Sequence, residues 1–215
     1  MSELATLRQE YAQAELSREH VADDPIEQFR SWFDDALDAE VDEPNAMTLA
    51  TAAPDAAPSA RIVLLKGVDA RGFRFYTNYE SRKGTQLAQN PHAALVFWWP
   101  PLERQVRIEG TAARLPDDES TEYFRSRPWG SRLGAWASPQ SRVVESREAL
   151  EDNLDAVEAK YEDAETIPRP PHWGGYVVQP TAIEFWQGRS NRLHDRLRYR
   201  RPSLDDDWTL DRLAP

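Results

Sequence analysis

The sequence predicts a mainly β protein with flanking helices (α+β), in which antiparallel strands form a barrel. Three observations predict this class. Short runs rich in β-branched and aromatic residues follow one another closely from residue 46 onward. Turns that contain proline or glycine separate these runs, as they do in hairpins. Few long helical segments lie between the runs, so parallel strands with helical crossovers are not expected.

Two helical segments precede the first strand. Residues 2–20 are polar with a few apolar residues on one side, which predicts a helix. Asp24 and Pro25 mark the start of a second helix, because aspartate is a favoured N-cap and proline suits the first helical position. The apolar residues of this helix recur at helical spacing and are Ile26, Phe29, Trp32, Phe33, Ala36 and Leu37. We expect a single domain over residues 1–215, with a helical extension over about residues 1–44.

The remaining elements follow in order along the chain. Strands are predicted over residues 47–52, 60–68, 72–79, 93–99, 104–115, 176–186, 193–199 and 208–213. Helices are predicted over residues 82–89, 117–126, 131–137 and 146–161, and residues 168–171 form a proline-rich linker. The chain contains no GxGxxG, GxxxxGK[ST] or HExxH motif, so dinucleotide-binding, P-loop and zinc-protease folds have no support.

Composition limits the classes of protein and partner. The 215 residues include no cysteine, which excludes disulfides, thiolate metal sites and cysteine nucleophiles, and we expect no metal site. No apolar run approaches the ~20 residues needed to cross a bilayer, and the first ten residues lack the apolar core of a signal peptide. We therefore expect a cytoplasmic protein. The formal net charge of −11 disfavours binding to nucleic acid or to an anionic membrane.

Basic residues are nevertheless concentrated in two short islands, residues 61–83 and 189–202. Such islands in an acidic chain favour a small anionic ligand over a polyanion, although chance patches on a solvated surface explain the charge alone equally well. Two of the three lysines, Lys66 and Lys83, lie in the first island. A compact ammonium group suits a phosphate, so this island is the stronger candidate for an anion site.

Two segments of the first island have a physical reason to bind an anion. Residues 61–66 read RIVLLK, a strand with a cation at each end, which is either a platform for a ligand with an anionic tail or an ordinary strand with solvated ends. Ser81 is a plausible helix N-cap that places Arg82 and Lys83 in the first helical turn. Cations are unfavourable there because the helix dipole is positive, and a bound anion would relieve that repulsion. Exposed charge tolerated at modest cost is the alternative.

Two later segments contain further candidates. Tyr123 and Arg127 are four residues apart on one helical face, and Ser131 could cap the next helix. Such donors are typical of phosphate recognition, although chance placement fits the spacing as well. Residues Arg192, His194 and Arg196 alternate, so they would face one pocket if they lie on a strand. Because neighbouring arginines disfavour a charged histidine, we expect neutral His194 near pH 7, with a purely structural histidine as the alternative.

Taken in order, these segments resemble the pyridoxine/pyridoxamine 5′-phosphate oxidase family. The resemblance extends from about residue 7 to residue 215 and rests on many short motifs. They are RIVLLK at 61–66, FYTN at 75–78, SRK at 81–83, LERQV at 102–106, YF-S-RP across 123–128, GAW at 134–136, QS at 140–141, WGG at 173–175, EFWQG at 184–188, RLHDR at 192–196 and DRLAP at 211–215. It implies an FMN-binding split β-barrel that works as a homodimer, with the flavin at the subunit interface.

The resemblance also implies roles for individual residues. The FMN-contacting residues would be Arg61, Ile62, Val63, Leu64, Lys66, Tyr76, Thr77, Arg82, Lys83, Gln105, Gln140, Ser141, Trp186 and Arg196. The residues around the substrate phosphate would be Lys66, Tyr123, Arg127 and Ser131, with the catalytic pair Arg192 and His194 near the reacting carbon. Arg8 and Tyr11 match residues that can close over the pocket. Two departures from the family pattern, Arg189 and Trp129, have no role assigned by the resemblance.

The activity that the resemblance implies is oxidation of pyridoxine 5′-phosphate or pyridoxamine 5′-phosphate to pyridoxal 5′-phosphate. Molecular oxygen would be the electron acceptor and hydrogen peroxide a product. One alternative is a related split-barrel flavin oxidase that acts on another substrate, such as a phenazine precursor. A second is a non-catalytic protein that sequesters flavin or pyridoxal phosphate. The residues placed at a substrate phosphate argue against the first alternative, and a turnover measurement would decide the second.

Overall fold

The computed structural model describes residues 10–11 and 14–215. Its strands are β1 (Ala46–Ala52), β2 (Pro58–Leu64), β3 (Gly67–Asp69), β4 (Gly72–Asn78), β5 (His92–Trp99), β6 (Arg104–Arg114), β7 (Trp173–Gln187), β8 (Asp195–Arg200) and β9 (Thr209–Arg212). Its α-helices are α1 (Pro25–Asp38), α2 (Arg82–Gln89), α3 (Asp117–Ser126), α4 (Trp129–Ala137) and α5 (Arg147–Tyr161), with 3-10 helices η2 (Arg18–His20), η3 (Pro100–Leu102) and η4 (Ser190–Arg192). Among the described residues every strand pairing is antiparallel, which confirms the predicted class.

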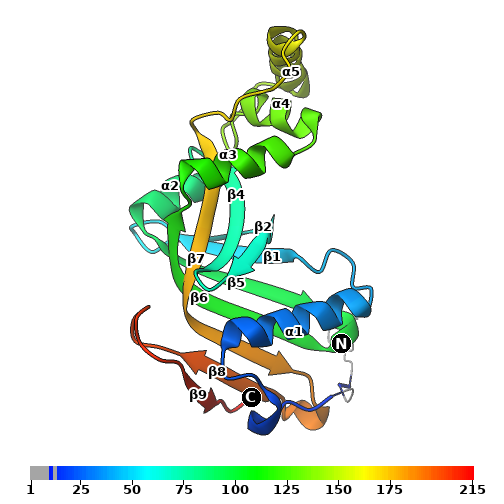
Figure 1. The fold of residues 1–215 in the computed structure, drawn as a ribbon, viewed down its shortest axis with the longest axis vertical. Coiled ribbons are helices and arrows are strands. Elements are labelled where there is room, and N and C mark those ends of the chain that lie inside the picture. The colour runs from blue at the N-terminus through cyan, green and yellow to red at the C-terminus, as the bar shows by residue number, and fades with distance from the viewer. Residues whose placement is uncertain (1–9, 12–13) are drawn as a thin grey trace, which may run out of the picture.

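Strand β7 connects the two ends of the molecule (Figure 1). The strand order is β2-β1-β5-β6-β7-β4-β3, with β8 beside β7 and β9 beside β8. Residues 173–178 of β7 pair with β4, and residues 182–187 pair with β8. Helices α3, α4 and α5 gather at one end of the molecule, whereas β8, β9 and the C-terminus lie at the other. The two halves of β7 therefore contribute to opposite ends of the fold.

Helix α1 covers the main hydrophobic core. Asp24 caps its start as predicted, because the Oδ1 atom accepts a hydrogen bond from Ile26 N at 2.6 Å. Phe29 is fully buried, and its ring centroid lies 4.9 Å from that of Phe73 in an edge-on contact. Burial of one such ring contributes about 1.5–3 kcal/mol to folding. Leu37, predicted on the same apolar stripe, is instead 52% exposed and lines a groove beside the helix.

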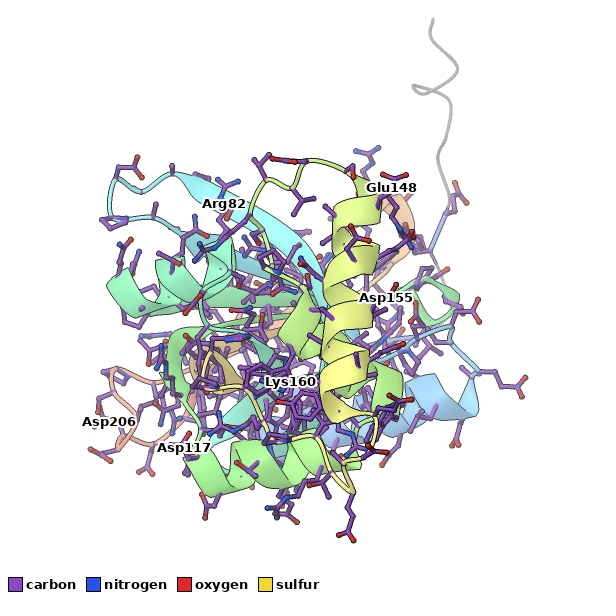
Figure 2. All side chains as sticks on the ribbon, turned by 90° about the horizontal axis from the view of Figure 1, so that it is seen from above. Arg82, Asp117, Glu148, Asp155, Lys160 and Asp206 are labelled. Atoms are coloured by element: carbon purple, nitrogen blue, oxygen red, sulfur yellow. The ribbon has the colours of Figure 1, made fainter. Side chains whose placement is uncertain are left out.

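A second hydrophobic cluster holds the helical end together. Its buried members are Phe124, Leu133, Tyr161, Ile167 and Trp173, which come from α3, α4, α5, the linker and β7. Helix α5 presents charged residues such as Glu148 and Asp155 to solvent on the outside of the molecule (Figure 2). The buried cluster fixes α3 against the first half of β7, and both elements carry residues of the candidate site.

The strand predicted over residues 60–68 is two strands, so this prediction is wrong. Strand β2 pairs with β1 and ends at Leu64, and β3 pairs with β4 from Gly67. Between them, Leu65 N donates to Asn45 O and Lys66 N donates to Arg74 O, both at 2.8 Å. The chain changes its hydrogen-bonding partner at this point, which interrupts the strand. Lys66 therefore leaves the strand and lies at the junction of the two sheet segments.

Four further predictions need correction. Among the described residues of the predicted helix over residues 2–20, only η2 is helical, because residues 14–16 are held by tertiary contacts described below. The predicted strand over residues 193–199 begins at residue 195, because Asn191 and Arg192 adopt left-handed conformations (φ 56° and 61°). Helix α4 begins at Trp129 after Pro128, so Ser131 lies in its first turn and does not cap it. Strand β7 also begins three residues earlier than predicted.

None of the helices in residues 10–11 and 14–215 is long and apolar enough to cross a membrane. In this same part of the chain, no three histidine, aspartate or glutamate side chains gather where they could hold a metal ion.

Candidate functional site

A cavity of about 520 Å³ lies at the helical end of the molecule, between β2, β4, α3 and the loop after α4. Twelve of its fifteen lining residues are among those predicted from the sequence, and they are Arg61, Ile62, Val63, Leu64, Lys66, Tyr76, Thr77, Lys83, Tyr123, Arg127, Ser131 and Gln140. Its remaining lining residues, Ser126, Pro128 and Trp173, were not predicted, although Trp173 begins the WGG motif. Among the described residues, the lining contains four cations and no carboxylate, so the cavity is suited to an anionic ligand.

Lys83 lies at one end of this cavity, in the first turn of α2. Ser81 caps that helix as predicted, since its Oγ accepts from Gly84 N at 3.3 Å. Lys83 Nζ donates to Thr77 Oγ1 and to Gln140 Oε1, both at 3.0 Å. Burial, and secondly repulsion from Arg61, lower the pKa of Lys83 to about 8. The ammonium group is thus hydrogen-bonded to neutral oxygens only, and an anion would stabilise its charge.

Arg61 is fixed beside Lys83 by hydrogen bonds to the neighbouring strand β1 and to its own strand β2. Its guanidinium donates to Leu49 O at 3.1 Å, and to Thr51 Oγ1 and Ser59 Oγ at 2.6 Å. Burial, followed by the charge of nearby Arg82, lowers the pKa of Arg61. The three cations predicted at one anion site are therefore close enough to repel one another, and the hydrogen bonds of Arg61 hold it in place.

Arg127 lies at a second position in the same cavity, against aromatic rings. Its guanidinium carbon is 4.6 Å from the ring centroid of Trp173, and its Nη1 atom is buried without a hydrogen-bond partner in the described structure. Burial lowers the pKa of Arg127. Tyr123 stacks on Tyr76 with centroids 3.8 Å apart. A buried guanidinium N–H without an acceptor is unfavourable, so this position is suited to ligand oxygen atoms.

The other predicted residues form a second group at the opposite end of β7. Gln105 and Trp186 are partners across β6 and β7, and Trp186 and Arg196 are partners across β7 and β8. The His194 ring lies 4.6 Å from that of Trp186, and Tyr11 meets both rings at 5.8 and 5.9 Å. This second group therefore combines the cation Arg196 and the titratable ring of His194 with the aromatic rings of Trp186 and Tyr11.

His194 has a defined hydrogen-bonding state. The main-chain N–H of Arg189 donates to its Nδ1 atom at 3.1 Å, so the neutral ring carries its proton on Nε2. Burial, followed by the charge of Arg192, lowers the pKa of His194, in agreement with the neutral state predicted. The predicted alternation of Arg192 and His194 on a strand is wrong, because both precede β8. Arg192 ends η4 instead, with an exposed side chain.

Glu184, within the EFWQG motif, was not predicted as a site residue but positions Arg196. Arg196 donates from Nε and Nη2 to the Glu184 carboxylate at 2.7 and 3.1 Å, and Arg107 donates to the same group. Burial alone would raise the pKa of Glu184, but the two guanidinium groups outweigh it and lower the pKa. The carboxylate is therefore charged and fixes the Arg196 guanidinium. The sequence signal that could have identified Glu184 is an acidic residue within a predicted apolar strand, in a chain whose other strands carry arginines.

A single chain does not bring the two groups together. Trp173 of the cavity and Trp186 of the second group are thirteen residues apart on β7, up to ~40 Å along an extended strand. Two predicted residues lie outside both groups: Arg82 is exposed on α2, and Ser141 is exposed with a left-handed backbone (φ 71°). Arg8 lies outside the described residues. The candidate site is consequently divided within one chain.

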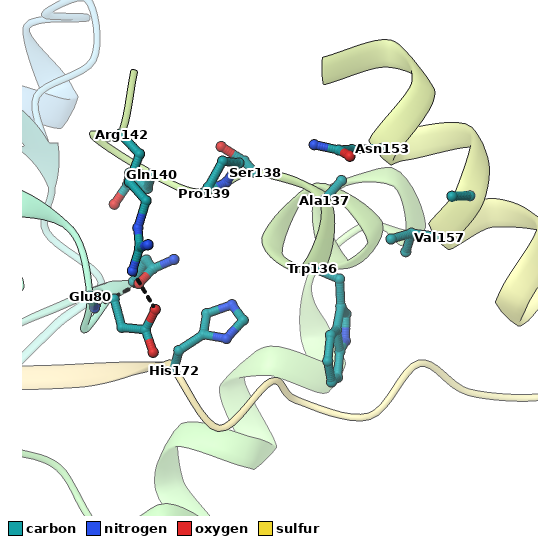
Figure 3. Close-up of a pocket in the computed structure, with 12 residues that line it drawn as sticks. Glu80, Trp136, Ala137, Ser138, Pro139, Gln140, Arg142, Asn153, Val157 and His172 are labelled. Atoms are coloured by element: carbon teal, nitrogen blue, oxygen red, sulfur yellow. Dashed lines mark hydrogen bonds and ion pairs between the residues drawn. The ribbon is translucent and has the colours of Figure 1, made fainter. Parts of the chain in front are cut away.

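A further cavity of about 440 Å³ lies next to the first, between α4, α5 and the loop after α4 (Figure 3). Gln140 lines both cavities. Glu80 and Arg142 form an ion pair at 3.4 Å across its mouth, and the His172 ring is hydrogen-bonded to Ala135 O at 3.1 Å. Apart from Gln140, none of the residues predicted for the site lines this cavity, and it lacks the excess of cations found in the first.

Comparison with known proteins supports the resemblance noted in the sequence. Residues 33–161 match the family model described as pyridoxamine 5′-phosphate oxidase, and residues 173–215 match that of the pyridoxine 5′-phosphate oxidase C-terminal dimerisation region. A pyridoxine/pyridoxamine 5′-phosphate oxidase of Salinibacter ruber is 76% identical over the whole of both chains. A protein of the same name from a Cyanothece species is 59% identical, and the match covers 99% of this chain and 98% of the Cyanothece protein.

Solved structures agree with this assignment. PhzG from Burkholderia lata, in complex with tetrahydrophenazine-1-carboxylic acid, has a TM-score of 0.88 and 33% identity, and the match covers 95% of this chain and 99% of that one. A pyridoxamine 5′-phosphate oxidase-related, FMN-binding protein of Nostoc punctiforme shares the split-barrel fold, with a TM-score of 0.67, 20% identity and coverage of 87% and 97%. By sequence along its whole length and by fold, the chain belongs to the pyridoxine/pyridoxamine 5′-phosphate oxidase family.

Proposed function

We propose that this protein is an FMN-dependent oxidase that converts pyridoxine 5′-phosphate or pyridoxamine 5′-phosphate to pyridoxal 5′-phosphate, with molecular oxygen as electron acceptor and hydrogen peroxide as product. The observation that carries this proposal is the cavity with four cations and no carboxylate in its lining. Its cations stand at separate positions, and the reaction needs two phosphate groups to be held, one of the cofactor and one of the substrate. The named relatives of the family support the same activity.

The residues of the cavity fit FMN. Arg61 and Lys83 of its lining, with the exposed Arg82 next to them on α2, would hold the phosphate of FMN, because these cations lie close together without a carboxylate partner in the described structure. Gln140 and Ser141 would add polar contacts from the neighbouring loop. When bound, FMN would supply the acceptor for the hydride, which carries the two electrons that leave the substrate. The cavity volume of about 520 Å³ lies within the usual range for cofactor sites.

The substrate phosphate would lie at the second cationic position. Arg127 offers a buried N–H without a partner in the described structure, and Lys66, Tyr123 and Ser131 line the same part of the cavity. A substrate without a phosphate would leave these groups desolvated and unpaired, which is unfavourable. This argues against the phenazine-type substrate suggested by the ligand of PhzG, the solved relative with 33% identity.

A homodimer would complete the divided site. Residues 173–215 match a dimerisation region, and this region includes Trp186, Arg192, His194 and Arg196. We place the second group of one subunit against the cavity of its partner, with FMN at the interface. Neutral His194, whose Nδ1 atom is occupied by the Arg189 N–H, would then donate from Nε2 near the reacting carbon. The exposed Arg192 would hold the substrate ring against the flavin.

Visible absorption spectroscopy of the purified, FMN-loaded protein tests this function. Addition of pyridoxamine 5′-phosphate without oxygen should bleach the flavin bands, and admission of air should restore them while pyridoxal 5′-phosphate appears. Bound flavin that stays oxidised would contradict the proposed substrate, while leaving the fold assignment intact. Failure to bind FMN after reconstitution would overturn the proposal as a whole.

The affinity for FMN should fall as the pH rises through about 8, where Lys83 loses its proton. A phosphate favours the charged lysine, so binding above this pH must include uptake of a proton. We expect FMN to bind roughly tenfold more weakly at pH 9 than at pH 7. Fluorescence titration of the apoprotein would measure the profile. The same slope in a Lys83→Met variant would assign the effect to another group.

A further inference from the structure

The described part of the N-terminal segment lies across the surface that carries Trp186 and His194. We call residues 10–11 and 14–16 the strap. The Tyr11 ring meets the Trp186 ring edge-on, with centroids 5.8 Å apart and planes at 85°, and it meets His194 at 5.9 Å. A side chain on Gly188 would approach the Tyr11 side chain to 2.7 Å, so a glycine at this position leaves room for the strap. The strap is therefore seated directly on the second group of site residues.

Leu16 is the fixed end of the strap. Its N–H donates to Asp195 Oδ2 and its carbonyl accepts from Arg212 Nη2, both at 3.1 Å. Its side chain is buried in the main core. These contacts fix the main chain of Leu16 on both sides, and they explain why this residue is not helical. Residues before Leu16 need a separate contact if Tyr11 is to stay over His194.

Arg189 supplies that separate contact. Its Nη1 atom donates to Ala14 O at 3.2 Å, and its Nη2 atom pairs with Glu15 Oε1 at 2.8 Å. Its Nε atom lies 3.6 Å from Asp195 Oδ2, which orients the guanidinium toward the strap. The main-chain N–H of the same residue donates to His194 Nδ1. Arg189 therefore connects the strap to His194: its side chain contacts the strap, and its main-chain N–H is hydrogen-bonded to the His194 ring.

We propose that Arg189 is a positioning residue that latches the strap over the substrate side of the site and slows the escape of substrate and product. The proposal rests on the function proposed above, because it places the substrate near His194. The Glu15 side chain is 76% exposed, so the ion pair is weak and screened by salt. Such a contact can open in each turnover, as a latch must, whereas the Leu16 contacts keep the strap attached.

The side chain and the main chain of Arg189 can be separated by mutation. Arg189→Ala removes the contacts to Ala14 and Glu15 but keeps the N–H that sets the tautomer of His194. We expect the KM for pyridoxamine 5′-phosphate to rise by about threefold to fivefold, since an exposed ion pair contributes a factor of that order. The kcat should stay unchanged or rise slightly, because release becomes easier. Glu15→Gln should have a smaller effect in the same direction.

Hydrogen exchange provides a readout that does not depend on turnover. In the FMN-loaded protein without substrate, the peptide that spans residues 10–16 should exchange faster in Arg189→Ala than in the wild type. Arg147→Ala is a matched control, since it removes another exposed arginine–glutamate pair at 2.8 Å, on the distant helix α5. It should change neither the exchange of this peptide nor the KM. In the double variant of Arg189→Ala and Glu15→Gln, the KM should equal that of Arg189→Ala alone.

The results separate this proposal from the proposed function. Unchanged exchange of the strap in Arg189→Ala would overturn the latch, whatever the activity. A lower kcat with unchanged KM would also overturn it, because it would assign Arg189 a structural effect on the reacting groups. If the wild type does not oxidise pyridoxamine 5′-phosphate, the proposed function fails, and the exchange comparison still decides whether Arg189 holds the strap.

Discussion

Replacement of Lys83 by methionine should weaken FMN binding by roughly 30- to 150-fold, the equivalent of about 2–3 kcal/mol for one charged hydrogen bond. Lys83 is half-buried in the first turn of α2, where Ser81 caps the helix and the free N–H groups already favour an anion. Within the part of the chain that the structure describes, its Nζ atom is hydrogen-bonded only to Thr77 and Gln140. In the proposed site, the phosphate of FMN would supply the anionic partner of this ammonium group.

Isothermal titration of the apoprotein with FMN would measure this loss. Lys160→Met is a suitable control, because Lys160 is the lysine outside the basic islands and lies on α5, away from the cavity. Its FMN affinity should match the wild type. An affinity within about threefold of the wild type for Lys83→Met would rule out a direct contact between this lysine and the phosphate.

The same variant should leave the apoprotein at least as stable as the wild type. The pKa of Lys83 is lowered on folding, by burial first and by Arg61 second, so folding disfavours its charged form. At pH 7 the charged lysine is present in both the folded and the unfolded states, and removal of the charge relieves this penalty. A lower Tm for the apo variant would indicate a structural role instead. Thermal unfolding without FMN therefore separates ligand binding from folding.

Replacement of Arg192 by alanine should lower kcat/KM by roughly a hundredfold or more, about 3 kcal/mol, while FMN stays bound. Within the described residues, the Arg192 side chain is exposed and makes no hydrogen bond or ion pair. It therefore contributes little to the fold of its own chain. Arg192 has a left-handed backbone and ends η4, two residues before His194 of the second group, and the proposed homodimer would place it at the partner's cavity.

Rapid mixing without oxygen would measure the rate at which pyridoxamine 5′-phosphate reduces the bound flavin. Arg192→Lys should recover only part of the loss, because lysine keeps the charge but not the planar guanidinium. FMN titration of both variants should give affinities near that of the wild type. If Arg192→Ala and Lys83→Met weaken FMN binding to the same extent, the assignment of Lys83 to the cofactor and of Arg192 to the substrate is wrong.

Local sequence signals predicted most of the secondary structure. The Asp24-Pro25 pair, Ser81 and Ser146 mark helix starts that the structure confirms, because capping depends on residues within one helical turn. The bounds of α2, which Ser81 caps, and of α3 were also predicted without error. The predictions failed where partners distant in sequence decide the backbone. The break between β2 and β3 follows from a change of neighbour, from β1 to β4.

The sequence by itself determined the class of fold, the helix caps at Asp24 and Ser81 and, through its motifs, the residues expected to bind cofactor and substrate. Only the tertiary structure decided how these residues are grouped. The cavity collects those near β2, β4 and α3, and β7 carries Trp186 to the other end of the molecule. The roles of Glu184 and Arg189 also came from the structure alone, since their partners lie 12 and 174 residues away in the chain. The physical reason is that capping acts within one turn, whereas strand pairing and ion pairs join positions whose distance in space does not follow from their separation in sequence.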